Sequence, residues 1–346
     1  MDESKLTQTI NEMLRMGLLA ADESQGTIVN PKTIETRLVK AGIPATESNV
    51  NDWRRLVRDT PNLERYISGV ILEKSRVFLD AGEYSSRGIV LGVKVDEGTG
   101  ANLDTGEKVT VGLEGLQNRL LEYKNQGARF AKWRTVTPIG EVLPTYKGVQ
   151  ANMGTQVSYA QICQELDIVP ICEPEVLIDG GHSLTKSFEI TSRVLDTFFK
   201  MADHRCVYLP GTILKTSMVI YGKTYQGARN VEDVAEQTLV CLRDTVPQEV
   251  GGIVFLSGGQ TDRDAVLHLN AIKKRVYEVG FKVPWPISFS YSRAIQNDAM
   301  QIWQGNPNYV PLAQEALLER ARACAIASRG ALNPNFEYQI KAPKSI

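Results

Sequence analysis

The chain has 346 residues, of which 42% are hydrophobic and 23% are charged, enough apolar mass for a large core. Its 39 basic and 40 acidic residues give a net charge of -1, so nothing global favours nucleic acid or a membrane surface. No run approaches about 18 consecutive apolar residues, and we expect no membrane span. The three histidines and five cysteines lack metal-ligand or CxxC spacing, which predicts neither a metal site nor disulfides.

The N-terminus shows an amphipathic helical pattern over residues 5–16 and no apolar leader. We therefore expect a cytoplasmic protein, although a mature organelle protein stripped of its transit peptide would look the same. Eight short apolar runs follow, each ending in polar residues and rich in Val, Ile and Leu, as in buried parallel strands. The eight runs span residues 17–22, 68–73, 88–94, 129–134, 168–175, 206–215, 251–259 and 285–293.

Most gaps between these runs carry helical patterns. Apolar residues recur at three- and four-residue steps over 183–201, and a capping pattern at 261–264 opens a helix over 265–279. Residues 96–108 are rich in Gly and Asp and predict a loop or hairpin. The alternation predicts an α/β protein, a (β/α)8 TIM barrel with an N-terminal helix and a C-terminal helical extension and tail.

We expect one catalytic domain over 1–346, with a tail over about 331–346. An open doubly wound sheet is the alternative fold. The sequence contains no GxGxxG after a strand, no GxxxxGK[ST] and no GxSxG, so nucleotide-binding and serine-hydrolase functions lack support.

Ionisable residues gather at the C-terminal ends of the predicted strands, the face where barrel enzymes build their sites. Strand side chains repeat every second position, so the members of a pair two residues apart point to the same side. Any one of these charges alone would be read as a rim charge or a salt bridge, but the set indicates a site. The set comprises Asp22, Lys94, Lys132, Arg134, Glu173, Glu175 and Lys215.

Such a cluster suits chemistry on a phosphorylated carbonyl compound. A lysine held in an apolar wall beside another cation loses its proton more easily, and the neutral amine can attack a carbonyl. Lys215, at the end of an apolar run and with Lys132 nearby, would meet that requirement. Carboxylates can then move protons as the carbinolamine dehydrates to an iminium, an electron sink that allows a carbon–carbon bond to break.

The last two predicted strands carry what a phosphate group needs. Leu256-Ser-Gly-Gly259 offers successive backbone N–H groups in a turn where glycine permits close approach. Residues 289–293, FSYSR, add hydroxyls and an arginine able to bind phosphate with two hydrogen bonds. Barrel enzymes often bind phosphate after strands seven and eight, so the sequence predicts a phosphate site here.

At this point the sequence resembles the class I, Schiff-base-forming fructose-1,6-bisphosphate aldolases. The matching blocks come in the family's order and cover about residues 17–330. They are LLAADESQGT (18–27), GVKVDEG (92–98), FAKWR (130–134), EPEVL (173–177), GTILKTSMV (211–219), FLSGGQ (255–260) and FSYSRA (289–294). Together these blocks are highly specific.

The resemblance implies a metal-independent lyase that cleaves fructose 1,6-bisphosphate, with Lys215 as the Schiff-base lysine and Glu173 as the main acid–base residue. It makes Lys132 a polarising and proton-transfer group, with Arg134 also in the catalytic set. Asp22 would hold substrate hydroxyls, and Glu175 would orient the lysines. The C1 phosphate would lie against Ser257, Gly258, Gly259, Ser290, Ser292 and Arg293, and the distal phosphate against Ser24, Thr27 and Lys94. Arg37 would help bind phosphate.

The chain departs from the family pattern in three places. Thr36 precedes Arg37 where the family has lysine, after an apparent insertion, so a cation is lost unless Lys32 replaces it. Ser292 stands where the family has glycine, which matters if that backbone needs a positive φ. Well-known members end in a tyrosine that assists enamine protonation, whereas this chain ends KAPKSI, with Tyr338 as its nearest tyrosine.

Other functions remain open at this stage. An aldolase preferring sedoheptulose 1,7-bisphosphate or fructose 1-phosphate fits the altered region around Thr36, and a non-catalytic oligomeric scaffold of the same fold is a third possibility. A transaldolase fits the lysine but not the paired phosphate elements. The family is commonly tetrameric, which implies a homo-oligomer.

Overall fold

The computed structural model describes residues 1–27, 30–278, 280, 282–333 and 335. Within these residues, parallel strands close into a barrel in the order β1-β10-β9-β8-β7-β6-β3-β2. Each strand falls on one of the eight predicted runs, so the predicted TIM barrel is confirmed and the open sheet is wrong. The strands are β1 (Gly17–Ala21), β2 (Ile67–Leu72), β3 (Val90–Lys94), β6 (Phe130–Thr137), β7 (Val169–Val176), β8 (Ile213–Thr216), β9 (Gly252–Phe255) and β10 (Ile287–Tyr291).

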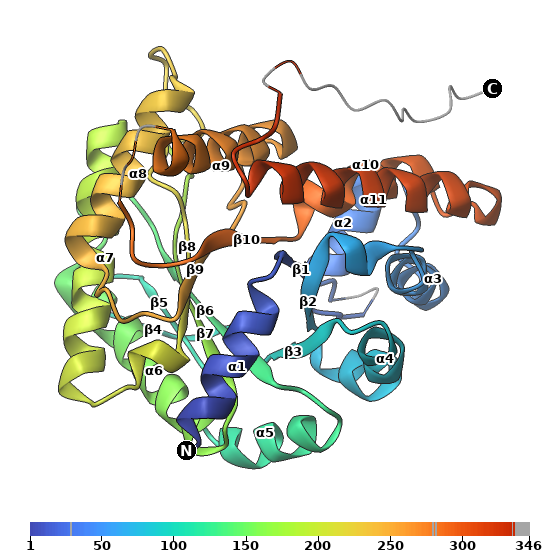
Figure 1. Ribbon diagram of the computed structural model, residues 1–346, viewed down its shortest axis with the longest axis horizontal. Helices are drawn as coiled ribbons and strands as arrows, with labels where there is room; N and C mark the ends of the chain where they lie inside the picture. Colours follow the sequence, from blue (N-terminus) through green and yellow to red (C-terminus); the bar gives the residue numbers. More distant parts are fainter. Residues whose placement is uncertain (28–29, 279, 281, 334, 336–346) are drawn as a thin grey trace.

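Helices surround the barrel; α10 follows the eighth strand, and α11, the predicted C-terminal extension, runs beside it (Figure 1). The helices are α1 (Glu3–Met13), α2 (Thr33–Lys40), α3 (Glu47–Arg58), α4 (Lys74–Ser86), α5 (Leu116–Asn125), α6 (Tyr146–Glu165), α7 (Leu184–His204), α8 (Val231–Thr245), α9 (Asp262–Tyr277), α10 (Arg293–Trp303) and α11 (Val310–Ala327). Thr261 caps α9 by accepting a hydrogen bond from the backbone N–H of Asp264, as the capping pattern predicted.

Some boundaries differ from the prediction for local reasons. The segment 206–215 forms a strand only from Ile213, because a 3-10 turn at Leu209–Gly211 contains Pro210, which lacks the N–H that a strand requires. Strand β6 runs three residues beyond the FAKWR block, pairing with β7 up to Thr137 and Val176. Residues 96–108 contain most of an antiparallel hairpin, β4 (Thr99–Asn102) and β5 (Lys108–Thr110).

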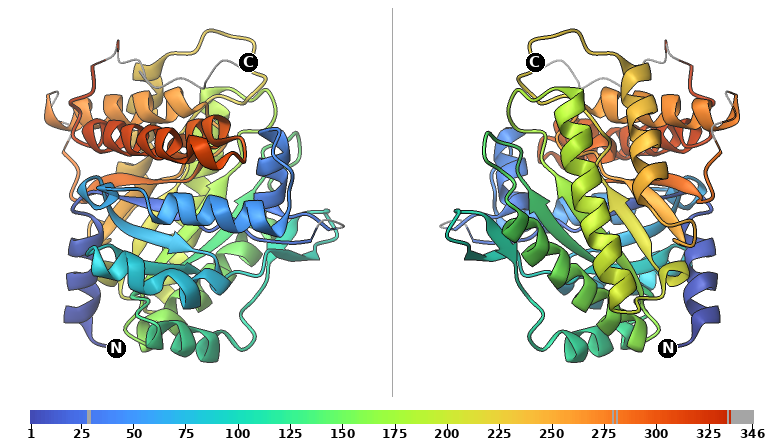
Figure 2. Two further views of the ribbon diagram at one scale, coloured as in Figure 1. Left: turned by 90° about the vertical axis from the view of Figure 1, so that its right-hand side faces the viewer. Right: turned by 90° about the vertical axis from the view of Figure 1, so that its left-hand side faces the viewer.

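The barrel interior is apolar at one end and polar at the other. Interior-facing side chains such as Leu18, Phe130 and Ile213 form one apolar cluster with Leu6 and Met13 of α1. Helix α1 crosses in front of the barrel in Figure 1 and lies at its edge in the side views of Figure 2, so it covers the N-terminal end of the strands. The C-terminal ends of the strands are left for the polar residues.

Two remaining expectations concern the chain ends and membranes. Tyr338 and most of the predicted tail lie outside the described residues. Among the residues that the structure does describe, no helix combines the length and the apolar character needed to cross a membrane.

Candidate active site

Side chains along a strand alternate between its two faces. This two-residue repeat places the predicted site residues next to the apolar cluster of the barrel interior, on its C-terminal side. On β1 the interior residues Leu18 and Ala20 are followed by Asp22, and on β6 Phe130 is followed by Lys132. In the same way Ile171 of β7 precedes Glu173, and Ile213 of β8 precedes Lys215. Four strands thus bring four ionisable side chains into the barrel mouth, as the sequence predicted.

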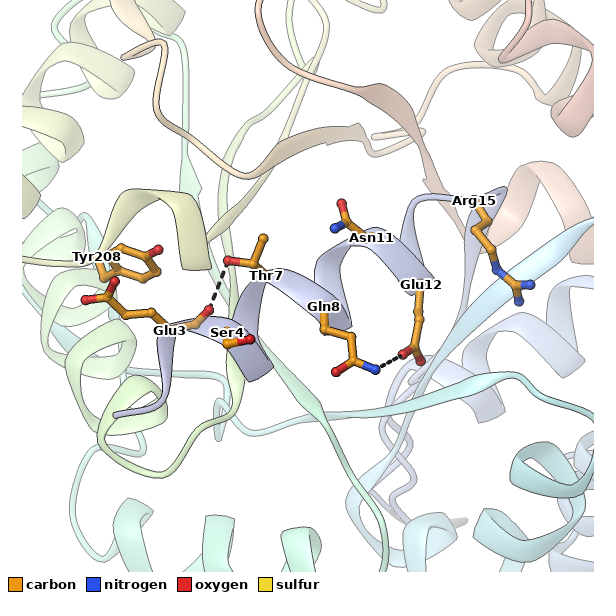
Figure 3. A pocket seen from close by; sticks show the side chains of 8 residues that line it. All are labelled: Glu3, Ser4, Thr7, Gln8, Asn11, Glu12, Arg15 and Tyr208. Carbon is orange, nitrogen blue, oxygen red and sulfur yellow. Dashed lines mark hydrogen bonds between the residues drawn. The ribbon is translucent and has the colours of Figure 1, made fainter.

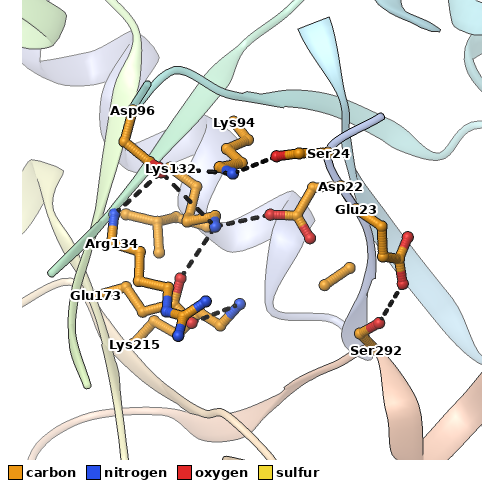
Figure 4. Close-up of polar contacts among 12 residues, drawn as sticks. Asp22, Glu23, Ser24, Lys94, Asp96, Lys132, Arg134, Glu173, Lys215 and Ser292 are labelled. Atoms are coloured by element: carbon orange, nitrogen blue, oxygen red, sulfur yellow. Dashed lines mark hydrogen bonds and ion pairs between the residues drawn. The ribbon is translucent and has the colours of Figure 1, made fainter. Parts of the chain in front are cut away.

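These four side chains form one connected cluster (Figure 4). The Glu173 carboxylate is shared by two lysines, with Oε1 3.1 Å from Lys215 Nζ and Oε2 3.2 Å from Lys132 Nζ. Lys132 Nζ also lies 2.7 Å from Asp22 Oδ2. The side chains of Lys132 and Lys215 are each 4% exposed and that of Glu173 is 5% exposed, so the cluster is almost fully shielded from water.

The outer members of the predicted set lie around this cluster. Arg134 Nε is 2.6 Å from Glu175 Oε2, so Glu175 binds the arginine, whereas the resemblance implied that it would orient the lysines. On the opposite side, Lys94 Nζ donates a hydrogen bond of 2.8 Å to Ser24 Oγ, which brings together two residues predicted to bind the distal phosphate. Thr27 lies instead on the exposed turn beyond, where its hydroxyl accepts from the backbone N–H of Asn30.

The cluster fixes the charges of its members. Burial by itself would raise the pKa of Asp22, but the neighbouring cations, first Lys132 and then Lys215, bring that pKa well below its usual value. Burial would likewise raise the pKa of Glu173, and the same two lysines lower it instead. Burial would lower the pKa of Lys132, yet the surrounding carboxylates raise it above its usual value. Both carboxylates and Lys132 are therefore charged at neutral pH.

Acid is expected to weaken the fold through Asp22 and Glu173. A carboxyl group with a lowered folded-state pKa stabilises the protein above its unfolded pKa, near 4, and this stabilisation is lost as the pH falls through the folded value. In urea unfolding between pH 7 and pH 3, the free energy of unfolding should fall by about 2 kcal/mol more in the wild-type protein than in Lys132→Met, which lacks the cation responsible. Equal falls in the two proteins would contradict this assignment.

The predicted phosphate elements lie beside the cluster. Gly258 and Gly259 have φ values of +46° and +86°, left-handed conformations that favour glycine. A Cβ atom on Gly258 would lie 3.6 Å from Glu175 Oε1, so this turn borders the polar cluster. Ser257 is buried at the start of the same turn.

Ser290 supports a ligand site at this place. Its neighbours Phe289 and Tyr291 belong to the large hydrophobic cluster that includes the surrounding helices, so both point out of the barrel. Ser290 therefore faces the barrel interior, where it is 1% exposed. Its hydroxyl has no hydrogen-bond partner among the described residues. A buried hydroxyl without a partner costs free energy, and a bound anion would satisfy it.

Arg37 and Arg293 approach the same side. Arg293 is the exposed first residue of α10, whose N-terminal N–H groups favour anions. Arg37 NH1 lies 3.2 Å from Ser292 Oγ, which places Arg37 with the residues predicted for the C1 phosphate. Ser292 has φ −104°, so serine fits this backbone without strain where the family has glycine.

Two site residues were missed in the sequence. Asp96, with a side chain 5% exposed, lies 3.6 Å from Lys94 Nζ and 4.0 Å from Lys132 Nζ. It stands two residues after Lys94, so the alternation rule could have found it. Glu23 forms an ion pair with Arg37 and accepts a hydrogen bond from Ser292, and no spacing pattern in the sequence indicates this contact.

A surface pocket lies along α1, at the other end of the barrel (Figure 3). Its lining is mostly uncharged polar and comprises Glu3, Ser4, Thr7, Gln8, Asn11, Glu12, Arg15 and Tyr208. Its lining contains no lysine, and its carboxylates are not shared between two lysines as Glu173 is. The barrel mouth is therefore the candidate active site.

Sequence comparison gives a consistent assignment. Residues 5–345 match the family model described as fructose-bisphosphate aldolase class-I. A probable fructose-bisphosphate aldolase class 1 of Xanthomonas axonopodis pv. citri is 41% identical over 342 residues, covering 95% of this chain and 99% of the relative. A cytosolic fructose-bisphosphate aldolase of Arabidopsis thaliana is 40% identical over 340 residues, covering 95% of this chain and 84% of the relative.

Structural comparison agrees. The structure resembles fructose-bisphosphate aldolase from Plasmodium falciparum, solved in complex with TRAP and a small-molecule inhibitor, with a TM-score of 0.90 and 36% identity over 96% of both chains. The family model spans nearly the whole chain, and this chain covers 99% of the Xanthomonas relative and 84% of the Arabidopsis relative. The chain is an enzyme of the class I fructose-bisphosphate aldolase family.

Proposed function

We propose that this chain catalyses the reversible cleavage of fructose 1,6-bisphosphate to dihydroxyacetone phosphate and glyceraldehyde 3-phosphate, through a Schiff base on Lys215 and without a metal ion. The observation that carries the proposal is the buried Glu173 carboxylate, shared between Lys215 and Lys132 at 3.1 and 3.2 Å. It gives the nucleophile an immediate proton acceptor inside a water-poor site.

The first step is attack of Lys215 on the substrate ketone. Lys215 passes one proton to Glu173, and the freed electron pair on Nζ forms a bond to C2. A second proton moves from Nζ to the carbonyl oxygen, which becomes the hydroxyl of a neutral carbinolamine. Glu173, now protonated, returns its proton to that hydroxyl, which leaves as water. The product is an iminium whose positive charge lies among the carboxylates of Glu173 and Asp22.

The second step breaks the bond between C3 and C4. A carboxylate, Glu173 in our assignment, takes the proton of the C4 hydroxyl, and the C3–C4 electron pair moves into the iminium to form an enamine. Glyceraldehyde 3-phosphate leaves with the new aldehyde. The proton that Glu173 took from the C4 hydroxyl then passes to C3 of the enamine, which restores the carboxylate and the iminium. Hydrolysis of the iminium by water releases dihydroxyacetone phosphate and restores Lys215.

A bisphosphate matches the two cationic ends of the site. One end holds the Ser257–Gly259 turn, the Ser290 hydroxyl, which has no partner within the described part of the chain, and the arginines Arg37 and Arg293. The other end holds Lys94 and Ser24, 2.8 Å apart. Asp96, Arg134 and Glu175 would keep the lysines and the rim charges in place.

The proposal also covers the domain organisation, the cellular compartment and the oligomeric state. The chain acts as one catalytic domain, functions in the cytoplasm and forms a homo-oligomer, a tetramer by family resemblance. Support for the compartment comes from the Arabidopsis relative, which is named as cytosolic.

The test is cleavage of fructose 1,6-bisphosphate by the purified protein, measured with and without EDTA. Borohydride is then added in the presence of dihydroxyacetone phosphate, and the modified residue is mapped by mass spectrometry. We expect unchanged activity in EDTA and one adduct, on Lys215. An adduct on another lysine, or activity that EDTA removes, would contradict the mechanism.

A further inference from the structure

A polar network joins the two segments that carry Arg37 and Ser292. Ser292 Oγ donates a hydrogen bond of 2.6 Å to Glu23 Oε1 and accepts from Arg37 NH1 at 3.2 Å. It also accepts from Gln296 Nε2 at 3.1 Å, so all the bonding capacity of the hydroxyl is used. Arg37 itself forms an ion pair with Glu23 and donates to Asn297 Oδ1 at 3.3 Å.

This ion pair differs from the flexible pairs on a protein surface. The side chains of Arg37 and Glu23 are each 10% exposed, so their attraction is only weakly screened by solvent. The pair is also held by neighbours on other elements, Ser292 before α10 and Asn297 within it. Arg37 is therefore already paired with the Glu23 carboxylate at the place where a phosphate is proposed to bind.

We propose that Glu23 and Ser292 form a counterion latch for Arg37, and that a substrate phosphate binds by taking the Arg37 guanidinium from Glu23. The inference rests on the proposed function, because it concerns the phosphate end of that site. Glu23 and Ser292 are positioning residues in this scheme, since they act on the phosphate through Arg37. The latch lowers affinity for phosphorylated ligands by the free energy needed to break the internal pair.

Glu23 retains a cationic neighbour when Arg37 leaves it. Arg54 lies behind Glu23, where its NH2 group donates 3.3 Å to the Glu23 backbone carbonyl and its charge acts on the Glu23 carboxylate. Both side chains line one small internal cavity together with Gln296. Gln296 Nε2 also lies 3.3 Å from Glu23 Oε1. The exchange of partners therefore does not leave a bare carboxylate in the protein interior.

The serine at position 292 is what strengthens the latch in this chain. A glycine there, as in the family pattern, would keep the backbone N–H but would remove the hydroxyl that joins Glu23, Arg37 and Gln296. Ser292→Gly should weaken the hold on Arg37 while the backbone stays compatible, because φ is −104° at this residue.

The experiment measures binding of a non-cleavable hexitol 1,6-bisphosphate by calorimetry, with phosphate-free hexitol as the reference ligand. Glu23→Gln and Ser292→Gly should each bind the bisphosphate about threefold to tenfold more tightly than the wild-type protein, the effect of losing one partly buried contact to a charged group. Combining Glu23→Gln with Arg37→Met should abolish this gain, because the gain acts through Arg37. Binding of the unphosphorylated hexitol should not change.

The matched control is Glu12→Gln, which removes another glutamate–arginine pair, Glu12–Arg129, at the α1 end of the barrel. It should leave bisphosphate binding unchanged. Unchanged or weaker binding in Glu23→Gln and Ser292→Gly, in a protein that cleaves fructose 1,6-bisphosphate, would overturn the latch alone. A wild-type protein that neither binds the bisphosphate nor cleaves the substrate would overturn the proposed function and the latch together.

Discussion

Lys215→Met is expected to abolish both cleavage of fructose 1,6-bisphosphate and borohydride trapping of dihydroxyacetone phosphate. Methionine has nearly the length of lysine and fills the same buried position, but it cannot form a bond to the ketone. Losses of a covalent nucleophile reach about 10⁴-fold or more in the turnover number, and we expect a loss of this size. A coupled assay gives the turnover number, and intact-mass spectrometry after borohydride treatment gives the adduct.

A buried lysine elsewhere in the chain provides the control. Lys273 on α9 is 6% exposed and donates from Nζ to the Ile287 carbonyl at 3.2 Å, at the beginning of β10 and far from the barrel mouth. Lys273→Met removes a similar buried ammonium and should retain both turnover and the adduct. Persistent trapping in Lys215→Met would assign the Schiff base to another lysine.

The strands and the direction of their side chains could be predicted from the sequence because both depend on local patterns. Continuous Val, Ile and Leu runs marked the eight strands, and the two-residue repeat placed Lys132 and Glu173 on the interior face. The same rule covers Asp96, two residues after Lys94. These features require no knowledge of distant contacts.

The pairing of charges across strands could not be predicted in the same way. In the register of β6 and β7, Arg134 lies beside Glu173, yet it bonds to Glu175, two residues further along. Lys132 likewise lies beside Ile171 and bonds to Glu173. Both cations reach diagonally across the tilted strands, so their partners depend on the geometry of barrel closure, which sequence spacing does not contain.

Contacts between segments far apart in the chain were even harder to predict from the sequence. Glu23 and Arg37 meet Ser292 across more than 250 positions of the chain, and neither residue continues a periodic pattern into that contact. The sequence placed Ser292 among the residues expected to bind the C1 phosphate and marked it as a departure from a family glycine, but it indicated neither Glu23 nor Arg37 as a partner. Ser292 bonds to Glu23 and Arg37 because barrel closure places β1 next to β10, so that the segments following these two strands meet.

Glu173→Gln should lower the turnover number about 10²- to 10⁴-fold, because an amide can neither take the proton from Lys215 nor return it to the leaving hydroxyl. Glutamine keeps the size of the side chain, so substrate binding should change much less than turnover. Single-turnover trapping with borohydride should show slow adduct formation on Lys215. Steady-state kinetics give the division between kcat and KM.

Two further variants separate proton transfer from a purely structural role. Glu173→Asp keeps the carboxylate one methylene further back and should recover part of the lost turnover, whereas a structural role would be served better by glutamine. Glu175→Gln removes the next carboxylate on β7, which pairs with Arg134, and should cost less than Glu173→Gln. If Glu175→Gln lowers the turnover number more than Glu173→Gln does, the acid–base role belongs to Glu175. Removing the carboxylate that transfers the proton must cost more than removing one that only holds Arg134.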